Sequence, residues 1–164
     1  MSVLVRDATP ADAAVIADIY NPYVTESTAT FDTHPVDTAD RIEWLAARDA
    51  RHPVVVAESD GKVVGWGSLS PWGTRPAWHR TAEVSTYVAP DHRGGGVGLA
   101  LMEALLQRAR EVGHHVVIAQ IVGGNDSSLA LAERTGFEHV GVLREVGDKF
   151  GRFHDLVLVQ QILS

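Results

Sequence analysis

A glycine-rich segment near the middle of the chain constrains its fold more than any other feature. The segment covers residues 93–99 and reads Arg-Gly-Gly-Gly-Val-Gly-Leu. It follows a β-branched run at residues 81–88 that ends at Ala89-Pro90, and it leads into residues 96–112, where apolar side chains recur at helical spacing. The chain must therefore pass from a strand through a glycine turn directly into a long amphipathic helix.

This succession of strand, glycine turn and helix is typical of a phosphate-binding site. Glycines let successive N–H groups point into one concavity and let a ligand approach the backbone, because no Cβ stands in the way. The start of the helix adds a partial positive charge. The chain has 21 acidic and 14 basic residues, so backbone donors allow it to bind a polyanion without a basic surface. A flexible turn that holds no ligand is the alternative interpretation of the glycines alone.

Two common nucleotide-binding patterns do not match this turn. A Walker loop requires Gly-Lys-Ser or Gly-Lys-Thr, whereas Val97 and Gly98 follow Gly96 here. The dinucleotide fingerprint requires a third glycine, whereas Leu99 stands in its place and the turn follows an antiparallel hairpin. The sequence therefore disfavours ATP and NAD as ligands.

The first third of the chain predicts one strand and two helices. We expect a strand at residues 3–6 and then a helix that begins at Thr9-Pro10 and buries Ala13, Ile16, Ala17 and Tyr20. Residues 21–35 read as an irregular stretch, which is long for a loop and indicates either a functional segment or a short helix at residues 26–31. Asp37 is expected to cap a second helix that turns Ile42, Leu45 and Ala46 inward.

The remaining segments predict an α+β fold with a sheet of mixed direction and helices on its faces. Asp60-Gly61 joins residues 53–59 and 62–69 as a β-hairpin. Further strands are expected at residues 81–88, 115–122, 138–146 and 153–162, with helices over residues 96–112 and from Asn125 or Asp126 to Gly136. No repeat or linker divides the chain, so residues 1–164 are expected to form a single domain.

Composition and charge exclude several classes of protein. The net charge of −7 argues against a general nucleic-acid binder, which needs clustered lysine and arginine. No run approaches the ~20 apolar residues that cross a bilayer, and residues 1–15 carry charges where a signal peptide would be apolar, so a soluble cytoplasmic protein without membrane partners is expected. The chain has no cysteine, and its eight histidines lack the spacing of metal ligands, so no metal is expected.

At this point the sequence resembles the GCN5-related N-acetyltransferases (GNAT), and within them the phosphinothricin and methionine sulfoximine acetyltransferases. The segment from Arg93 to Leu99 is similar to the coenzyme A pyrophosphate loop of that family. Nearly the whole chain is covered, since further matches follow in order: Asn21, Tyr23, Glu26-Ser27-Thr28, Phe31, Pro71-Trp72, Arg75, Thr81-Ala82-Glu83, Tyr87-Val88, Asn125-Asp126, Gly136-Phe137 and residues 149–155. The resemblance implies a single-domain fold with a mixed, mostly antiparallel sheet flanked by about four helices.

The resemblance also implies acetyl-CoA as co-substrate and a set of residues that bind it. In the family, the strand before the glycine loop splays from its neighbour and pairs with the pantetheine arm. Carried over to this chain, the cofactor contacts are Thr86, Tyr87 and Val88 on that strand, Arg93, Gly94, Gly95, Gly96, Val97, Gly98 and Leu99 in the loop, and the side chain of Asn125. The family's enzymes are homodimers, and the resemblance implies a homodimer here.

For catalysis, the resemblance places Glu83 as the general base that removes a proton from the substrate ammonium. The alternative is that Glu83 pairs with an arginine such as Arg80 while water takes the proton. Many relatives have a tyrosine or histidine seven residues after the asparagine as general acid, but Ala132 stands there. Tyr87 or a bound water is the expected substitute.

For the substrate, the resemblance implies a small amine, with Arg75 and Lys149 binding its acidic group and Phe31, Trp72 and Trp78 forming apolar walls. Relatives carry a basic residue at the place of Gly73, so a neutral or zwitterionic amino-acid analogue is as consistent as a strongly anionic one. We expect an N-acetyltransferase acting on a small amino acid or an analogue such as phosphinothricin, methionine sulfoximine or methionine sulfone. The alternatives are acetylation of peptide or protein N-termini, polyamines or aminoglycosides, or a catalytically silent CoA-binding module.

Overall fold

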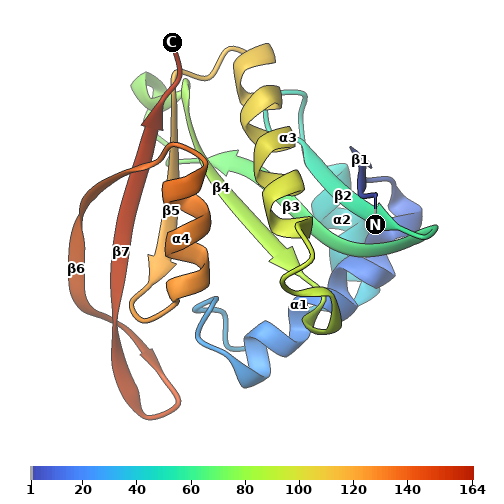
Figure 1. Cartoon of the computed structure of the whole chain (residues 1–164), viewed down its shortest axis with the longest axis horizontal. Coiled ribbons are helices and arrows are strands. Elements are labelled where there is room, and N and C mark those ends of the chain that lie inside the picture. Colours follow the sequence, from blue (N-terminus) through green and yellow to red (C-terminus); the bar gives the residue numbers. More distant parts are fainter. Residues whose placement is uncertain (1) are drawn as a thin grey trace.

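The computed structural model describes residues 2–164; Met1, which belongs to the expected domain, lies outside the described residues. It confirms an α+β fold, a seven-stranded mixed sheet with four α-helices (Figure 1). The helices are α1 (Ala13–Glu26), α2 (Thr38–Ala46), α3 (Val97–Glu111) and α4 (Asp126–Arg134). The strands are β1 (Leu4–Asp7), β2 (Val54–Ser59), β3 (Lys62–Pro71), β4 (Thr81–Val88), β5 (Val116–Val122), β6 (Glu138–Lys149) and β7 (Arg152–Ile162).

The sheet splits between its two central strands. Its order is β1-β2-β3-β4-β5-β7-β6, and β4 and β5 form a parallel pair between neighbours that all run antiparallel. The parallel register covers the pairs Thr81–Val116, Ala82–Val117 and Glu83–Ile118. Beyond Glu83 the two strands separate, so residues 84–88 of β4 have no strand beside them on that edge (Figure 1).

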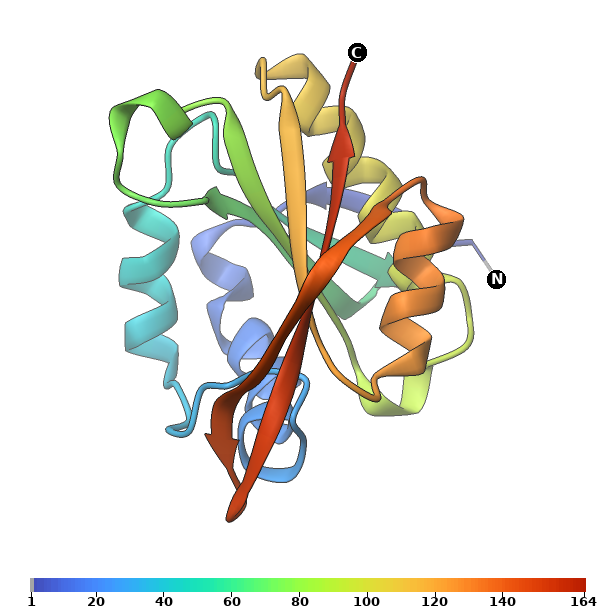
Figure 2. The same ribbon diagram turned by 90° about the vertical axis from the view of Figure 1, so that its left-hand side faces the viewer.

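Helices cover the two faces of the sheet in pairs. Figure 2 shows α1 and α2 on one side and α3 and α4 on the other. On the α3 side, Leu101 and Leu105 pack on Leu69 and Val84, and all four side chains are buried. On the α1 side, the core contains residues of helix and sheet: Ile16, Ile19, Tyr20, Tyr23, Val24, Val54, Val56 and Trp66. Burial of such side chains stabilises the fold by roughly 1.5–3 kcal/mol each, which fixes both helix pairs against the sheet.

Two expectations for the first third of the chain are wrong. Helix α1 does not end before Asn21 but continues through Pro22 to Glu26, and no separate helix forms over residues 27–31. Proline removes the N–H that would bond to the carbonyl of Asp18, but Asp18 is exposed, so water can satisfy that carbonyl. The burial of Tyr23 and Val24 after the proline keeps the last turn helical.

Helix α2 also packs differently from the expected pattern. The Asp37 cap is confirmed, since its side chain accepts a hydrogen bond from the Asp40 N–H at 2.8 Å. Ile42 and Ala46, however, are exposed, and the helix turns Trp44 and Leu45 toward the core. Trp44 meets Trp66 at 5.4 Å between ring centroids, and this aromatic contact outweighs the smaller area that Ile42 would bury.

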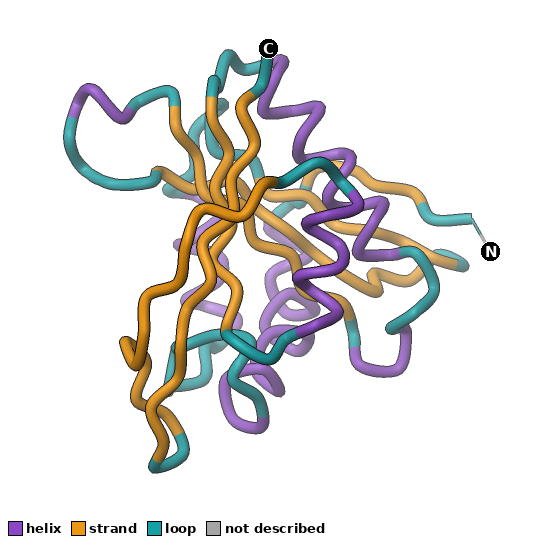
Figure 3. Tube along the Cα trace, turned by 60° about the vertical axis from the view of Figure 1, so that its left-hand side comes forward, coloured by secondary structure: helices purple, strands orange, loops and turns teal. Residues whose placement is uncertain are grey.

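The two hairpins differ in how well the sequence predicts them. The β2–β3 hairpin turns at Asp60 and Gly61, which have φ of 52° and 75°, as the Asp-Gly pair predicts. The β6–β7 hairpin is longer than expected and extends past the helices (Figure 3). Its register shifts between Leu143 and Gly147, where Glu145 adopts a φ of 58° and donates its N–H to the Asp155 carboxylate at 2.9 Å. No helix in residues 2–164 is long and apolar enough to span a membrane.

Candidate active site at the strand split

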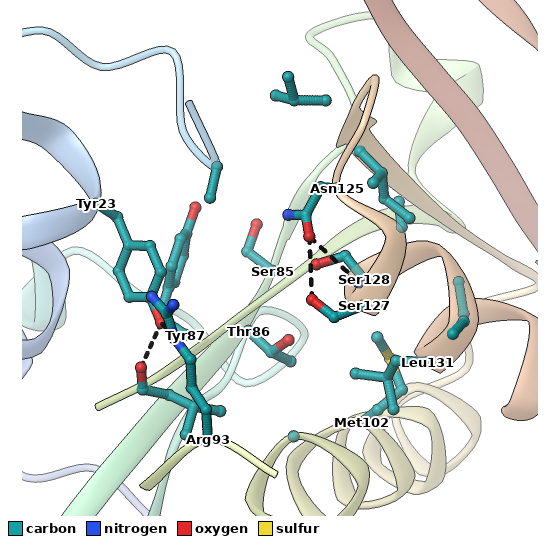
Figure 4. Close-up of a pocket in the computed structure, with 18 of the residues that line it drawn as sticks. Tyr23, Ser85, Thr86, Tyr87, Arg93, Met102, Asn125, Ser127, Ser128 and Leu131 are labelled. Atoms are coloured by element: carbon teal, nitrogen blue, oxygen red, sulfur yellow. Dashed lines mark hydrogen bonds between the residues drawn. The ribbon is translucent and has the colours of Figure 1, made fainter. Parts of the chain in front are cut away.

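A cavity of about 810 Å³ opens where β4 and β5 separate. Its walls are residues 84–88 of β4, the end of β5, the glycine loop and the start of α4. Figure 4 shows Tyr23, Tyr87 and Arg93 on one side, Asn125, Ser127 and Ser128 on the other, and Ser85 and Thr86 between them. The cavity therefore joins the expected phosphate loop to the free edge of β4.

The glycine loop presents backbone donors to this cavity. Gly94 and Gly96 have φ of 79° and 85°, and a Cβ at either position would meet no other atom within 4 Å, so the space beside the loop is open. Gly96 is the N-cap of the 15-residue α3 and makes no side-chain cap, so the first N–H groups of the helix stay available for an anion. The lining includes Arg93, Gly94, Gly96, Val97, Gly98 and Leu99, whereas Gly95 is not part of it. The loop fits a diphosphate.

Tyr23 holds Arg93 and the end of β4 in place. Its hydroxyl donates to the Val88 carbonyl and accepts a hydrogen bond from Arg93 Nε at 3.3 Å. The Arg93 guanidinium also lies 5.0 Å from the centroid of the Tyr23 ring. Thr86, Tyr87 and Val88 all line the cavity, as expected of strand residues that meet the pantetheine arm.

Asn125 lies at the opposite wall, where it caps α4. Its side-chain oxygen accepts hydrogen bonds from the Ser128 N–H at 3.3 Å and from the Ser127 hydroxyl at 3.2 Å (Figure 4). The amide nitrogen of Asn125 takes no part in these two bonds. The cap therefore fixes the side chain with a donor left for a ligand.

Glu83 lies at the last paired position before the split. It is partly buried, and burial raises the pKa of its carboxyl group. Gln120 of β5 donates its side-chain amide to Glu83 Oε2, which lowers the pKa of Glu83 and partly opposes the effect of burial. Arg80, the expected alternative partner, instead donates to the Gly113 carbonyl at 2.9 Å. Glu83 itself is not among the residues that line the cavity, but its neighbour Val84 and its partner Gln120 are. A carboxyl group of raised pKa at this position accepts a proton more readily than an exposed one.

Tyr87 lines the same cavity within an aromatic cluster. Its ring centroid lies 4.9 Å from that of Trp66 and 5.0 Å from that of Tyr20. Burial is the main cause that raises the pKa of the Tyr87 phenol, so the hydroxyl stays protonated at neutral pH. Ala132 also lines the cavity and is buried, and its methyl group has no proton to donate.

The expected substrate residues lie outside the lining of this cavity. Trp72, Arg75 and Trp78 belong to the exposed segment between β3 and β4, where the Arg75 guanidinium lies 5.9 Å from the Trp78 ring centroid. A Cβ at Gly73 would lie 2.7 Å from the Trp78 ring. A larger residue at Gly73, such as the basic one that the resemblance places there, therefore requires the indole of Trp78 to move.

Lys149 is buried, and its donors are used within the protein. The residue is 5% exposed, and its ammonium donates to the carbonyls of Ser27 at 2.6 Å, Thr30 at 2.8 Å and Tyr23 at 3.3 Å. These three acceptors satisfy all three N–H donors of the group, so in this arrangement Lys149 has none left for the acidic group of a substrate. The resemblance over residues 149–155 singled out Lys149, but it did not indicate that the partners of Lys149 are main-chain carbonyls.

Two site residues, Gln120 and Tyr23, received no role from the sequence. Gln120 could have been found, because it is the one polar residue in the apolar run of β5, residues 116–122. The part of Tyr23 in holding Arg93 could not, because the contact joins residues 70 positions apart and depends on α1 continuing through Pro22.

Comparisons with known proteins agree with this geometry. The acetyltransferase (GNAT) family matches residues 16–137. An L-methionine sulfoximine/L-methionine sulfone acetyltransferase of Pseudomonas paraeruginosa is 43% identical over 98% of this chain and 94% of its own. A phosphinothricin N-acetyltransferase of Streptomyces coelicolor is 34% identical over 98% and 96%. A Salmonella typhimurium protein whose structure contains its cofactor acetyl-CoA superposes with a TM-score of 0.96 at 37% identity, covering 100% of this chain and 95% of the other. The chain belongs to the GNAT family and is an N-acetyltransferase that uses acetyl-CoA as co-substrate.

Proposed function

We propose that this enzyme acetylates the α-amine of a small amino acid or of an analogue such as methionine sulfoximine, methionine sulfone or phosphinothricin. The names of relatives that match nearly the whole chain support this class of substrate. Within the structure, the proposal depends on one observation: Glu83, a carboxylate of raised pKa, lies where β4 and β5 part, beside the cavity that fits acetyl-CoA.

We assign Glu83 the role of general base. The substrate amine enters as an ammonium ion and becomes nucleophilic when Glu83 accepts one of its protons, directly or through a water molecule. The neutral nitrogen then attacks the thioester carbonyl, the C–S bond breaks and the thiolate of CoA leaves. The nitrogen gives up its second proton as the amide forms, which balances the proton that the sulfur gains. Because the enzyme holds the amine and acetyl-CoA next to each other, they lose little further entropy in the transition state, an effect that lowers the activation barrier by up to ~7–11 kcal/mol.

The leaving thiolate depends less on proton transfer than the attacking amine does. We assign the proton donor to Tyr87 or to a bound water, because Ala132 occupies the place of the usual acid. The position of Tyr87 supports this assignment, since the residue lines the cavity. Because a thiolate is a good leaving group, the reaction proceeds without a dedicated tyrosine or histidine at position 132.

The amine site is proposed to lie on the sheet face shared by Glu83 and Gln120, with Phe31, Trp72 and Trp78 as apolar walls. Arg75 is the proposed partner of the substrate carboxylate, since its planar guanidinium suits that group and lies 5.9 Å from the ring centroid of Trp78, one of the proposed walls.

The test is release of free CoA thiol, measured with purified protein, acetyl-CoA and a panel of amino acids and analogues. We expect release with the small amino-acid analogues, and we expect Glu83→Gln to keep acetyl-CoA affinity but lose most turnover at pH 7, with part recovered at higher pH. Glu103→Gln, an exposed carboxylate on α3, is the matched control and should act like wild type. Equal rates for wild type and Glu83→Gln would remove Glu83 from the mechanism. Binding of acetyl-CoA without release of thiol for any amine supplied would favour the silent CoA-binding module.

We further propose that the enzyme is a homodimer of the cytoplasm, the compartment that supplies acetyl-CoA. The support for the dimer is β6, an edge strand that exposes Val140, Val142, Leu143 and Val146 by 46–54% each. Light scattering is expected to show a dimer for wild type and a monomer for Val142→Glu. Leu4→Glu, at a position of the opposite edge strand that is 61% exposed, is the control and should stay dimeric. A wild-type monomer would overturn the proposal.

A further inference from the structure

The Phe31 ring rests directly on a glycine of β6. A Cβ at Gly147 would lie 2.3 Å from Phe31 Cζ and 2.5 Å from Cε1, so only glycine fits beneath the ring as it stands. On the neighbouring strand, the ring of His154, which pairs with Gly147, lies 6.3 Å from the Phe31 ring. The end of the β6–β7 hairpin thus forms the floor on which Phe31 sits.

Lys149, two residues further along β6, ties the backbone before Phe31 to the same hairpin. Its ammonium bridges the carbonyls of Tyr23, Ser27 and Thr30, and His154 Nε2 bonds to the Lys149 carbonyl at 2.9 Å. Gly147 and Lys149 point to the same face because side chains alternate along a strand. The end of β6 therefore holds both the Phe31 ring, through Gly147, and the backbone of residues 27–31, through Lys149.

This contact lies over the same face of the sheet as the proposed base. Gln120, the partner of Glu83, pairs with Leu158 of β7, and His154 is four residues from Leu158 along that strand. An even spacing keeps both side chains on one face. Phe31 therefore covers the continuation of the surface that carries Glu83 and Gln120.

The hairpin reaches this position because β6 is bulged. The register shift between Leu143 and Gly147 inserts extra residues into β6 and bends it, and Asp155 of β7 holds the bulge through the Glu145 N–H. The bulge brings Gly147 opposite His154, where it receives Phe31.

We propose that Gly147 and Lys149 are positioning residues for the amine substrate, which act by fixing Phe31 and the segment 27–31 over the sheet face that carries Glu83. The inference rests on the proposed function, in which Phe31 is a wall of the amine site. Neither residue touches the reacting atoms. Ser27, Thr28 and Ala29 of the segment that they hold line the cavity at the strand split. The effect of the two positioning residues is on where the amine sits relative to Glu83, since neither Gly147 nor Lys149 contacts the glycine loop itself.

The first experiment compares Gly147→Ala with Gly141→Ala. Both add one methyl group to β6, but a Cβ at Gly141 meets no other atom within 4 Å. We expect Gly147→Ala to raise KM for the amine on the order of 10-fold or more, since small misplacements of a reactant are costly. The dissociation constant of acetyl-CoA should change less than twofold, and Gly141→Ala should match wild type in both. An unchanged KM for the amine in Gly147→Ala, or an equal loss of acetyl-CoA binding, would overturn the proposal.

Lys149 is tested by Lys149→Met and Lys149→Arg. The methionine keeps the length of the side chain but donates nothing, so three carbonyls lose their partner and the segment loosens. We expect the same rise in KM for the amine with Lys149→Met, and partial rescue with Lys149→Arg, which keeps the charge and donors. Should Lys149→Met fail to fold, the comparison of Gly147→Ala with Gly141→Ala still tests the proposal.

Phe31→Ala separates failure of this inference from failure of the proposed function. If Phe31→Ala leaves KM for the amine unchanged, Phe31 is not part of the amine site and the site assignment is wrong. If Phe31→Ala raises that KM while Gly147→Ala and Lys149→Met do not, the amine site stands and the positioning role falls.

Discussion

The Tyr23 hydroxyl joins the end of β4 to the glycine loop, donating to the Val88 carbonyl and accepting from Arg93 Nε at 3.3 Å. Tyr23 is on α1, so a helix on one face of the sheet orders the glycine loop that follows β4. The loop itself is rich in glycine and has little conformational preference of its own. Its shape therefore depends on a residue far away in the sequence.

Tyr23→Phe is expected to weaken CoA binding. The variant keeps the ring under the Arg93 guanidinium but removes both hydrogen bonds of the hydroxyl. At roughly 0.5–1.5 kcal/mol for each bond, the loss of both is worth about 1–3 kcal/mol, so the dissociation constant of CoA should rise about 5- to 150-fold in a calorimetric titration. Tyr20→Phe is the control, because its hydroxyl bonds to Thr30 and Asp32 rather than to the loop. Equal affinities for Tyr23→Phe and wild type would show that Arg93 is ordered without Tyr23.

Gln120→Leu is expected to move the acidic limb of the pH profile to higher pH. The Gln120 amide lowers the pKa of Glu83, so its removal leaves burial unopposed and raises that pKa. A base works only when deprotonated, so kcat/KM should fall on the acidic limb of the profile and return toward the wild-type value as the pH rises above that limb. The substitution leaves the other neighbours of Glu83 unchanged: Ser70, which pairs with Glu83 from β3 and is bonded to Arg48, and Tyr87, which lies on β4 with Glu83.

The control for Gln120 is Gln107→Leu, which removes an exposed amide of α3 that bonds only to Glu111. Its profile should superpose on that of wild type. An acidic limb that stays fixed in Gln120→Leu would mean that the observed ionisation is not that of Glu83, or that Gln120 does not hold it.

The features predicted correctly from the sequence are those that local chemistry decides. Glycines at 94 and 96, followed by an apolar helical stripe, specify a turn and a helix whatever surrounds them, and Asp60-Gly61 does the same for a hairpin. The resemblance to the family supplied the splayed strand, which no local pattern encodes. In the structure, β4 separates from β5 after Glu83, where the parallel register ends.

The errors arose where tertiary contacts override local preference. Pro22 indicates the end of a helix, but buried residues beyond it extend α1. The resemblance implies that Lys149 binds the acidic group of a substrate, yet three main-chain carbonyls far away in the sequence accept its donors. Neither outcome can be read from a window of neighbouring residues, since each depends on what the folded chain brings opposite.

Asp12 makes the stability of the enzyme depend on pH. Its carboxylate accepts hydrogen bonds from Arg6 at 2.8 and 3.0 Å and from the Thr9 N–H at 2.7 Å, and only 7% of the side chain is exposed. The Arg6 guanidinium is the main cause that lowers the pKa of Asp12 below its usual 3.8. A carboxyl with a lowered pKa in the folded state binds its proton more readily when unfolded. Its contribution to stability is thus complete above about pH 4 to 5 and is lost as the pH falls through the folded-state pKa.

Asp12→Asn should therefore lower the free energy of unfolding by about 2 kcal/mol at pH 7, the size expected for charge-assisted hydrogen bonds of this burial. The difference from wild type should narrow as the pH falls below 4, because the wild-type carboxyl then becomes neutral as well. Urea unfolding at pH 7, 5 and 3 measures both values. Asp7→Asn is the control, since the Asp7 carboxylate bonds to Arg108 but is 64% exposed, and its loss should cost less than about 1 kcal/mol. A difference between Asp12→Asn and wild type that stays constant from pH 7 to pH 3 would mean that the charge of Asp12 does not stabilise the fold.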